Sequence, residues 1–296
     1  MAMLMSGCNL VFGLDPADRT DAAVDAPGDA DEDSTTDASL GKWGAATTIP
    51  NLATSNIEED PFLSPDGLEL YIGYLATASP TSYDIVRSRR VATNQQWPPP
   101  VRVAEVSGTT FDWTPKLSAD GMTLYFSTDR LGTVGGFDTW RSLRSSSVVA
   151  WSLPSHVEDP AINTTASDRS VMYCLGSTRG VFTSDRNGNQ YDLYELVNGD
   201  AEPIAVAASM AVTEASPWVS EDCLTVYFTS NAANPADFDL YVMSRTSIDN
   251  PFDTPVRIEE LATTAIEADP WVSADGRHIV WASDRAGTLD IWEAVR

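Results

Sequence analysis

Short stretches in which apolar and polar residues alternate recur along most of this chain. They include LELYIGYL from Leu68, MTLYFSTD from Met122, LTVYFTSN from Leu224 and RHIVWASD from Arg277. Successive side chains of a β-strand point to opposite sides of the sheet, so such alternation is typical of strands that bury one face. The pattern therefore predicts an all-β protein built from similar units.

A common phrase precedes each of these strands. It consists of an acid, two residues, Pro, two residues, Ser, any residue, Asp and Gly, and its prolines are Pro61, Pro115, Pro217 and Pro270. A degenerate fifth copy, EDPAINTTASDRSVMYCLGSTR, begins at Glu158. Asp-Gly is a strong hairpin signal because glycine adopts a positive φ without a Cβ clash. Each copy thus predicts a first strand, a tight turn and a second strand.

A second phrase follows each copy, with an aromatic residue or Leu, then Asp, then an apolar-rich run. Its aspartates are Asp84, Asp138, Asp192, Asp239 and Asp290. We expect them to begin a third strand and to have a structural role, because Asp readily accepts hydrogen bonds from nearby backbone donors. A fourth strand fits residues 100–106, 203–209 and 255–261. Units of four strands that recur about every fifty residues predict the blades of a β-propeller, here with five blades.

The two ends of the repeat region complement each other. After Asp290 the last copy has a third strand but no fourth, whereas residues 45–52 have the pattern of a fourth strand and precede any first strand. We predict that these residues complete the fifth blade. The propeller then spans residues 42–296 and leaves no open sheet edge.

The wording of the repeat resembles a known family. Pro-x-x-Ser-x-Asp-Gly, followed by an apolar strand and Ser-x-Asp-Arg, is similar to the TolB-like β-propeller repeat. The resemblance covers roughly residues 42 to 296. It implies the propeller fold that the strand pattern also predicts.

Carboxylates recur where one blade leads into the next, at one mouth of the ring. The expected binding face consists of Glu58, Asp60, Asp112, Glu158, Glu214, Glu267 and Asp269. In the degenerate copy either Glu158 or Asp159 takes this place. Converging carboxylates repel one another unless a cation, a basic partner or raised pKa values relieve them. The mouth therefore predicts a site for a divalent cation such as calcium or for a basic partner, and solvated loop charges are the alternative.

Three arginines are expected on the same end of the ring. They follow an Asp in the Asp-Arg pairs that end at Arg130, Arg186 and Arg285. Guanidinium groups bind carboxylates in bidentate pairs, so we expect these arginines to offset part of the acidic charge.

Enzyme signatures are scarce in this sequence. There is no G-x-S-x-G, and His156 and His278 are the only histidines, which leaves a Ser-His-Asp site poorly supplied. Glycoside hydrolysis is the alternative, because some five-bladed propellers use carboxylates of successive inner strands, and Asp60, Asp112 and Glu158 occupy comparable places. We expect instead a monomeric binding or interaction scaffold whose partner is an envelope protein, a small ligand or a glycan.

The overall charge excludes some partners. The chain has 43 acidic and 18 basic residues among 296, a formal net charge of -25. Such a charge repels phosphate backbones and anionic lipid surfaces, so we expect no nucleic-acid partner. No apolar run is long enough to cross a bilayer as a helix.

The first forty residues predict an anchor and a tether. Cys8 follows Met-Ser-Gly, which resembles a bacterial lipobox and implies a lipidated cysteine, a signal-peptide remnant over residues 1–8 and a place in the cell envelope. Residues 9–41 are rich in Asp and small residues. They bury too little apolar surface to fold and are predicted to form an acidic, solvated tether to which the membrane connects only through the lipid.

The other two cysteines are far apart in the sequence. We place Cys174 in the second strand of blade three and Cys223 at the glycine position of the turn in blade four. A disulfide requires Cα atoms within about 7 Å of each other. We expect two free, mostly buried thiols.

Overall fold

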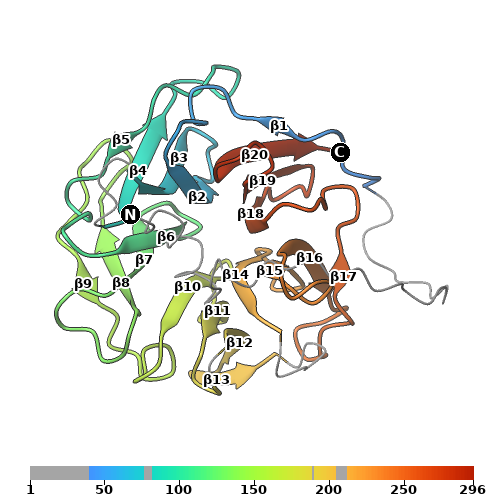
Figure 1. The fold of residues 1–296 in the computed structure, drawn as a ribbon. Coiled ribbons are helices and arrows are strands. Elements are labelled where there is room, and N and C mark those ends of the chain that lie inside the picture. Colours follow the sequence, from blue (N-terminus) through green and yellow to red (C-terminus); the bar gives the residue numbers. More distant parts are fainter. Residues whose placement is uncertain (1–39, 77–81, 189, 205–211) are drawn as a thin grey trace, which may run out of the picture.

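The protein is a five-bladed β-propeller. The computed structural model describes residues 40–76, 82–188, 190–204 and 212–296. These residues form twenty strands in five sheets, each of four antiparallel strands (Figure 1). The predicted fold class and the predicted number of blades are therefore confirmed.

Within blades one to four the strands follow the chain from the axis of the ring to its rim, whereas in blade five β18, β19 and β20 are followed at the rim by the N-terminal β1 (Figure 1). Blade one consists of β2 (Ile57–Leu63), β3 (Glu69–Leu75), β4 (Asp84–Arg89) and β5 (Val101–Arg102). Blade two consists of β6 (Asp112–Leu117), β7 (Thr123–Thr128), β8 (Asp138–Leu143) and β9 (Ser155–His156). Blade three consists of β10 (Asp168–Tyr173), β11 (Gly180–Ser184), β12 (Asp192–Val197) and β13 (Asp200–Pro203). Blade four consists of β14 (Glu214–Val219), β15 (Thr225–Ser230), β16 (Asp239–Ser244) and β17 (Val256–Arg257). Blade five consists of β18 (Glu267–Val272), β19 (His278–Ser283), β20 (Asp290–Val295) and β1 (Thr47–Thr48).

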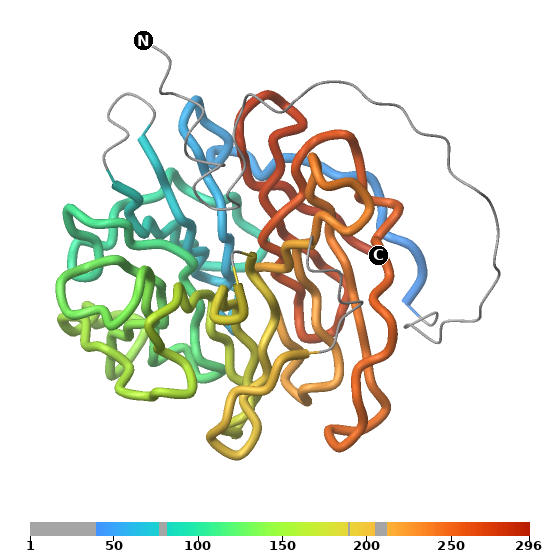
Figure 2. Tube along the Cα trace, turned by 60° about the horizontal axis from the view of Figure 1, so that its bottom comes forward, coloured from blue at the N-terminus to red at the C-terminus, as the bar shows by residue number. Residues whose placement is uncertain are grey.

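The N-terminal strand closes the ring as predicted. Strand β1 pairs antiparallel with β20, with Thr47 opposite Glu293 and Thr48 opposite Trp292. Both ribbon and tube views show the two segments side by side (Figures 1 and 2). The flanking residues Ile49 and Leu52 are buried in the hydrophobic core around this seam, so the closing segment adds apolar burial to its backbone hydrogen bonds.

The Ser-x-Asp-Gly turns have the conformation that their glycines require. Gly67, Gly121 and Gly276 have φ values of 67°, 70° and 67°, and Cys223 takes the same place with a φ of 61°. In each of these turns the serine hydroxyl donates to the aspartate, over 2.6 Å in all four cases. The aspartates of this phrase therefore stabilise turns.

Blade three departs from the predicted register. Its first strand begins at Asp168, and Glu158 lies in the connection between β9 and β10. The copy had been aligned wrongly because Val171 stands where the other copies have proline and the Ser-x-Asp-Gly phrase is missing. For the same reason β13 begins at Asp200, ahead of the predicted residues 203–209, of which 205–209 lie outside the described part of the chain.

Cys174 and Cys223 form a disulfide, so the expected free thiols were wrong. Cys174 directly follows β10, not in the second strand, and Cys223 lies in the turn between β14 and β15. Their Cα atoms are 5.6 Å apart, within the usual range for a bridge. The disulfide links the neighbouring turns of blades three and four.

The expected lipidation site, Cys8, and residues 9–39 of the expected tether over 9–41 lie outside the described residues. Within the described part of the chain, no helix is long and apolar enough to cross a membrane.

Candidate functional site

The acid that opens each innermost strand is buried. These first-strand acids are Glu58, Asp112, Asp168, Glu214 and Glu267. Asp168, not Glu158, is the member from blade three. The acids point into the protein and not into solvent, so the alternative of solvated loop charges is wrong for these positions, and their binding role stays a prediction.

In three blades an arginine neutralises the first-strand acid. Arg130 pairs with Asp112, Arg285 pairs with Glu267, and Arg186 pairs with Asp168 over 2.8 Å. Acid and arginine are 18 residues apart in all three cases. The expectation that these arginines offset the acids is therefore met through single contacts.

The same arginines tie the blade to the connection that precedes it. Arg130 donates to the carbonyl of Val106 over 2.7 Å, and Arg285 donates to that of Leu261 over 2.8 Å. Each of these arginines thus pairs with the first-strand acid and also donates a hydrogen bond to a backbone carbonyl of the preceding connection. The physical role of this repeated contact is structural.

Blades one and four have no arginine at the matching place, where Ala76 and Ala232 stand. Burial raises the pKa of Glu58 to about 7, and Asp290 of the neighbouring blade adds to the effect. Burial also raises the pKa of Glu214 to about 8, with a further contribution from Asp192. Both acids are therefore largely protonated at mildly acidic pH.

The aspartates that open the third strands mostly have structural partners. Asp84, Asp138 and Asp239 contact Arg102, His156 and Arg257 of the adjacent outer strand. Asp290 accepts the backbone N–H of Thr54 over 3.1 Å. These contacts connect strands within a blade or across the closing seam, in line with the structural role expected for this position.

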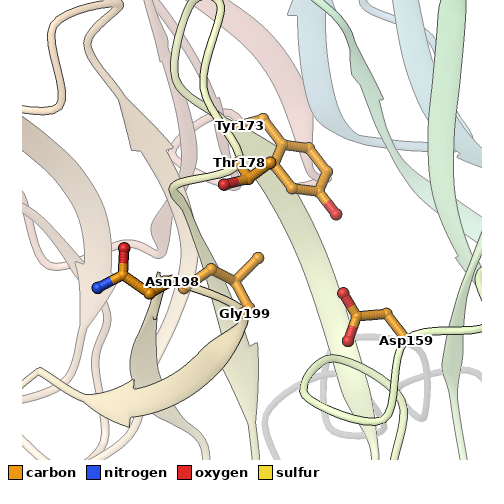
Figure 3. A pocket seen from close by; sticks show the side chains of 6 residues that line it. Asp159, Tyr173, Thr178, Asn198 and Gly199 are labelled. Carbon is orange, nitrogen blue, oxygen red and sulfur yellow. The ribbon is translucent and has the colours of Figure 1, made fainter.

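Glu158 and Asp159 lie away from the innermost strands. The Glu158 side chain is 87% exposed and contacts His156 over 3.2 Å. Asp159 lines a pocket of about 470 Å³ together with Tyr173, and the Tyr173 hydroxyl and the Asp159 carboxylate point into the same space (Figure 3). The trio Asp60, Asp112 and Glu158 proposed for hydrolysis is therefore not one site, because Asp112 is ion-paired inside a blade and Glu158 is on the surface.

A β-bulge recurs in every innermost strand, two residues after the first-strand acid. The bulge residues Asp60, Thr114, Ser170, Ser216 and Asp269 all have positive φ, between 51° and 57°. Residues other than glycine rarely adopt this conformation, so its recurrence in five blades indicates a feature imposed by the ring. All five side chains are polar and buried.

Two of these bulge residues form a carboxyl pair across the seam between blades five and one. The Asp269 carboxylate accepts the Asp60 backbone N–H over 3.2 Å, and the charge of Asp269 also acts on the Asp60 carboxyl. Burial raises the pKa of Asp60 well above its ordinary value and also raises that of Asp269. The pair therefore favours a state that retains a proton.

Two cations from blades two and three face this pair. Lys116 and Arg169 both act on the pKa of Asp60, and Arg169 also acts on that of Glu59. Residues from four blades approach one another in this way only where the innermost strands meet. We call Glu59, Asp60, Lys116, Arg169 and Asp269 the axis cluster.

Several polar atoms of the axis cluster have no hydrogen-bond partner among the described residues. They are Glu59 Oε1, Asp60 Oδ1, Lys116 Nζ and Arg169 Nε. Buried polar groups are normally paired, and an unpaired one costs about 1–3 kcal/mol. The cluster is therefore the place in the described structure where buried charge is least satisfied.

Arg169 is held in position by aromatic rings. Its guanidinium carbon lies 4.2 Å from the ring centre of Phe137, 4.5 Å from that of Tyr191 and 5.0 Å from that of Trp113. Rings on several sides hold the guanidinium plane without using its N–H donors. The group is thus oriented while its hydrogen-bonding capacity stays available.

The sequence pointed to part of this site. Asp60 and Asp269 were among the candidate residues, whereas Glu59, Lys116 and Arg169 were missed. Lys116 did carry a signal, because the other copies have Phe62, Met172, Trp218 and Trp271 at its repeat position. No group of three or more His, Cys, Asp or Glu side chains in the described ranges could hold a metal ion.

The sequence matches no protein-family model and no curated protein, whereas many solved structures are similar to this chain. An endo-arabinase from Bacteroides thetaiotaomicron is 12% identical, with 84% of this chain and 96% of that chain covered and a TM-score of 0.58. An alpha-L-arabinofuranosidase from Lactobacillus brevis is 14% identical, with 80% and 85% covered and a TM-score of 0.53. A TolB protein from Agrobacterium tumefaciens is 17% identical, with 82% and 78% covered and a TM-score of 0.47.

These likenesses bear on the fold alone. TolB proteins are among the similar structures, as expected from the repeat, and so are an endo-arabinase and an alpha-L-arabinofuranosidase. At such low identity a shared propeller does not transfer an activity. The function has to be argued from the axis cluster.

Proposed function

We propose that this chain is a ligand-binding propeller of the bacterial cell envelope, which binds a small polar ligand at the axis cluster. The observation that carries the proposal is a contrast among buried cations. Of the four buried Lys and Arg residues in the described structure, Arg144 pairs with Glu69 and Arg245 with Glu195, each over 2.7 Å. Lys116 and Arg169 are buried without any ion pair within 4.0 Å.

A binding site explains this contrast better than a purely structural role. A buried charge without a partner destabilises the folded state, and proteins retain such groups mainly where a ligand uses them. The axis cluster offers both donors and acceptors, which suits a ligand that carries both kinds of polar group. The predicted interaction with an envelope protein remains an alternative use of the same face.

The geometry favours binding over glycoside hydrolysis. Two carboxyl groups that hydrolyse a glycosidic bond lie about 5 Å apart or more, so that the sugar or a water fits between them. The Asp269 carboxylate already accepts the backbone N–H of Asp60 over 3.2 Å. The similarity to an endo-arabinase and an alpha-L-arabinofuranosidase gives hydrolysis no support beyond the fold.

A ligand screen tests the proposal. The full chain is heated with small metabolites and oligosaccharides, because a ligand that binds only the folded state raises the melting temperature. We expect a compound that stabilises the wild type but not Lys116→Met. The sequence has one other lysine, Lys42, whose side chain is 86% exposed, so Lys42→Met is a matched control that should respond like the wild type.

Two results would contradict the proposal. One is a compound that raises the melting temperature of Lys116→Met as much as that of the wild type, which would show that the binding site is not at the axis cluster. The other is the release of new reducing ends from an oligosaccharide, abolished in Asp60→Asn, which would make the protein a hydrolase.

The envelope location is a separate part of the proposal. It is supported by Cys8 after Met-Ser-Gly, by the acidic run that follows, and by a disulfide, which persists in oxidising compartments. Expression with the natural upstream sequence should give a lipid-labelled protein that partitions into detergent, and Cys8→Ser should remove the label. Unlabelled wild-type protein would exclude the anchor.

A further inference from the structure

We infer that the ligand of the axis cluster carries a carboxylate, which Arg169 and Lys116 bind together. This inference rests on the proposed function and names the chemistry of its ligand. It starts from the groups that lack partners, since each unpaired donor requires an acceptor.

The unpaired groups at the axis include three donors, two of which, on Arg169 and Trp113, belong to side chains in contact. The side chain of Arg169 has no hydrogen bond to a described residue, and its Nε is fully buried. The indole N–H of Trp113, whose ring lies 5.0 Å from the Arg169 guanidinium carbon, also has no partner. Lys116 Nζ is the third donor, and it lies 5.6 Å from the ring centre of Phe62.

Exposure of the two cations suits a buried contact with a ligand. Lys116 is 1% exposed and Arg169 is 7% exposed. A guanidinium presents paired N–H groups in a plane, which matches the two oxygens of a carboxylate. Because Phe137, Tyr191 and Trp113 already fix the Arg169 guanidinium, little side-chain entropy is lost when it binds an anion.

The charge of the cluster distinguishes a carboxylate from a phosphate. Glu59, Asp60 and Asp269 lie beside the two cations, so a ligand with two negative charges would be repelled. A single charge fits, because burial favours the protonated forms of these acids. A carboxyl that retains its proton can donate to the ligand, while Glu59 Oε1 and Asp60 Oδ1 can accept from hydroxyl or amino groups of the ligand.

Matched pairs of compounds test the inference. Calorimetric titration of the full chain compares galacturonate with galactose, glucuronate with glucose, lactate with propanediol, and an N-acetyl amino acid with its amide. We expect at least one carboxylate to bind about tenfold or more tightly than its neutral partner. Galactose 6-phosphate should bind no better than galactose.

Variants place the effect at Arg169. Arg169→Gln should weaken binding of that carboxylate about tenfold or more, and Arg169→Lys should recover only part of it because the planar fork is lost. Arg277→Gln removes the same charge from an exposed turn of blade five and should change nothing. Should Arg169→Gln fail to fold, Lys116→Met provides the second loss of affinity.

The outcomes separate this inference from the proposed function. Suppose that a neutral compound binds as tightly as its carboxylate partner and that Lys116→Met no longer binds it. That result refutes the preference for a carboxylate but supports a binding site at the axis. Equal carboxylate binding by Arg169→Gln and wild type also refutes it. If no compound of any pair binds, the result counts both against a carboxylate ligand and against a binding site at the axis.

Discussion

Asp269 accepts the backbone N–H of Asp60 over 3.2 Å across the seam between blades five and one. At the corresponding seams after blades two and four, a hydroxyl on the second strand accepts the backbone N–H of the bulge residue. Ser127 Oγ accepts the N–H of Ser170, and Thr229 Oγ1 accepts that of Asp269. Blade five has Ala282 at that position. The Asp269 carboxylate therefore replaces a missing hydroxyl, and this explains why an acid can persist at the axis before any ligand is considered.

The closing strand can be tested by truncation. A chain that begins at residue 53 lacks Trp43, which is buried and lies 4.2 Å from the Arg296 guanidinium, and lacks β1 itself. It exposes the edge of β20, and exposed edges pair with other chains. We expect aggregation or a large fall in melting temperature. A chain that begins at residue 40 is the control and should melt like the full chain, and a monomeric, equally stable shorter chain would refute closure.

The arginine contacts within blades should matter for stability. Arg285→Gln leaves Glu267 buried without its cation and the carbonyl of Leu261 without a donor. Breaking a buried ion pair on one side costs about 3 kcal/mol or more. We expect a fall of this size in the free energy of unfolding measured with urea. The exposed substitution Arg277→Gln should lie within about 0.5 kcal/mol of wild type.

The two acids without arginines should make stability depend on pH. The pKa values of Glu58 and Glu214 are raised to about 7 and about 8 in the folded state, from 4.5. The folded chain then holds protons that the unfolded chain releases, so their contribution is complete below pH 4.5 and is lost as the pH rises through 7 and 8. We expect the urea midpoint to fall between pH 5 and pH 8.5.

Replacing the missing arginine should reduce that dependence. Ala232→Arg introduces a guanidinium 18 residues after Glu214, the spacing seen for Arg130 and Asp112. The cation favours the ionised acid, so the fall in midpoint with pH should become smaller. Ala274→Arg, in an exposed turn, adds the same charge as a control. An unchanged pH profile in Ala232→Arg would show that Glu214 does not cause the dependence.

The repeat phrase was sufficient to predict the blades, because alternation, turns and ring closure are local properties of the sequence. The repeat phrase could not show that the first-strand acids at the mouth are buried. Whether Asp112 faces solvent depends on Arg130, which returns to it from the loop between β7 and β8 of the same blade, and only the constant spacing of 18 residues indicated this contact. The same spacing between Asp168 and Arg186 would have corrected the register of blade three.

The axis cluster was harder to foresee. Asp60 and Lys116 come from different blades, and their proximity depends on the diameter of the ring, which the sequence pattern does not specify. The disulfide was missed because the wrong register placed Cys174 inside a strand. With the correct register, Cys174 and Cys223 occupy adjacent turn positions of neighbouring blades.

The disulfide should stabilise the ring measurably. It joins residues 49 positions apart in sequence, and a loop of this size corresponds to about 4 kcal/mol in the chain-entropy account. We expect dithiothreitol to lower the melting temperature of the wild type. The double substitution Cys174→Ser with Cys223→Gly should show the lower value already and no response to the reductant, and an unresponsive wild type would show that the bridge is absent or without effect.

Lys116→Met separates a structural lysine from one kept for a ligand. Methionine is nearly as long as lysine, is apolar and fits beside the Phe62 ring, where the ammonium now lies without a hydrogen-bond partner. If the lysine held the carboxyl pair together, its removal would cost about 3 kcal/mol or more, as for other one-sided losses of buried pairs. If the lysine serves to bind a ligand, the free energy of unfolding of Lys116→Met should equal that of the wild type or exceed it by about 1 kcal/mol, because a desolvated charge has been removed. We expect the second result by urea unfolding without ligand, and Lys42→Met should match wild type. A large loss of stability in Lys116→Met would mean that Asp60 and Asp269 need the lysine for folding, and the case for a binding site at the axis would fall.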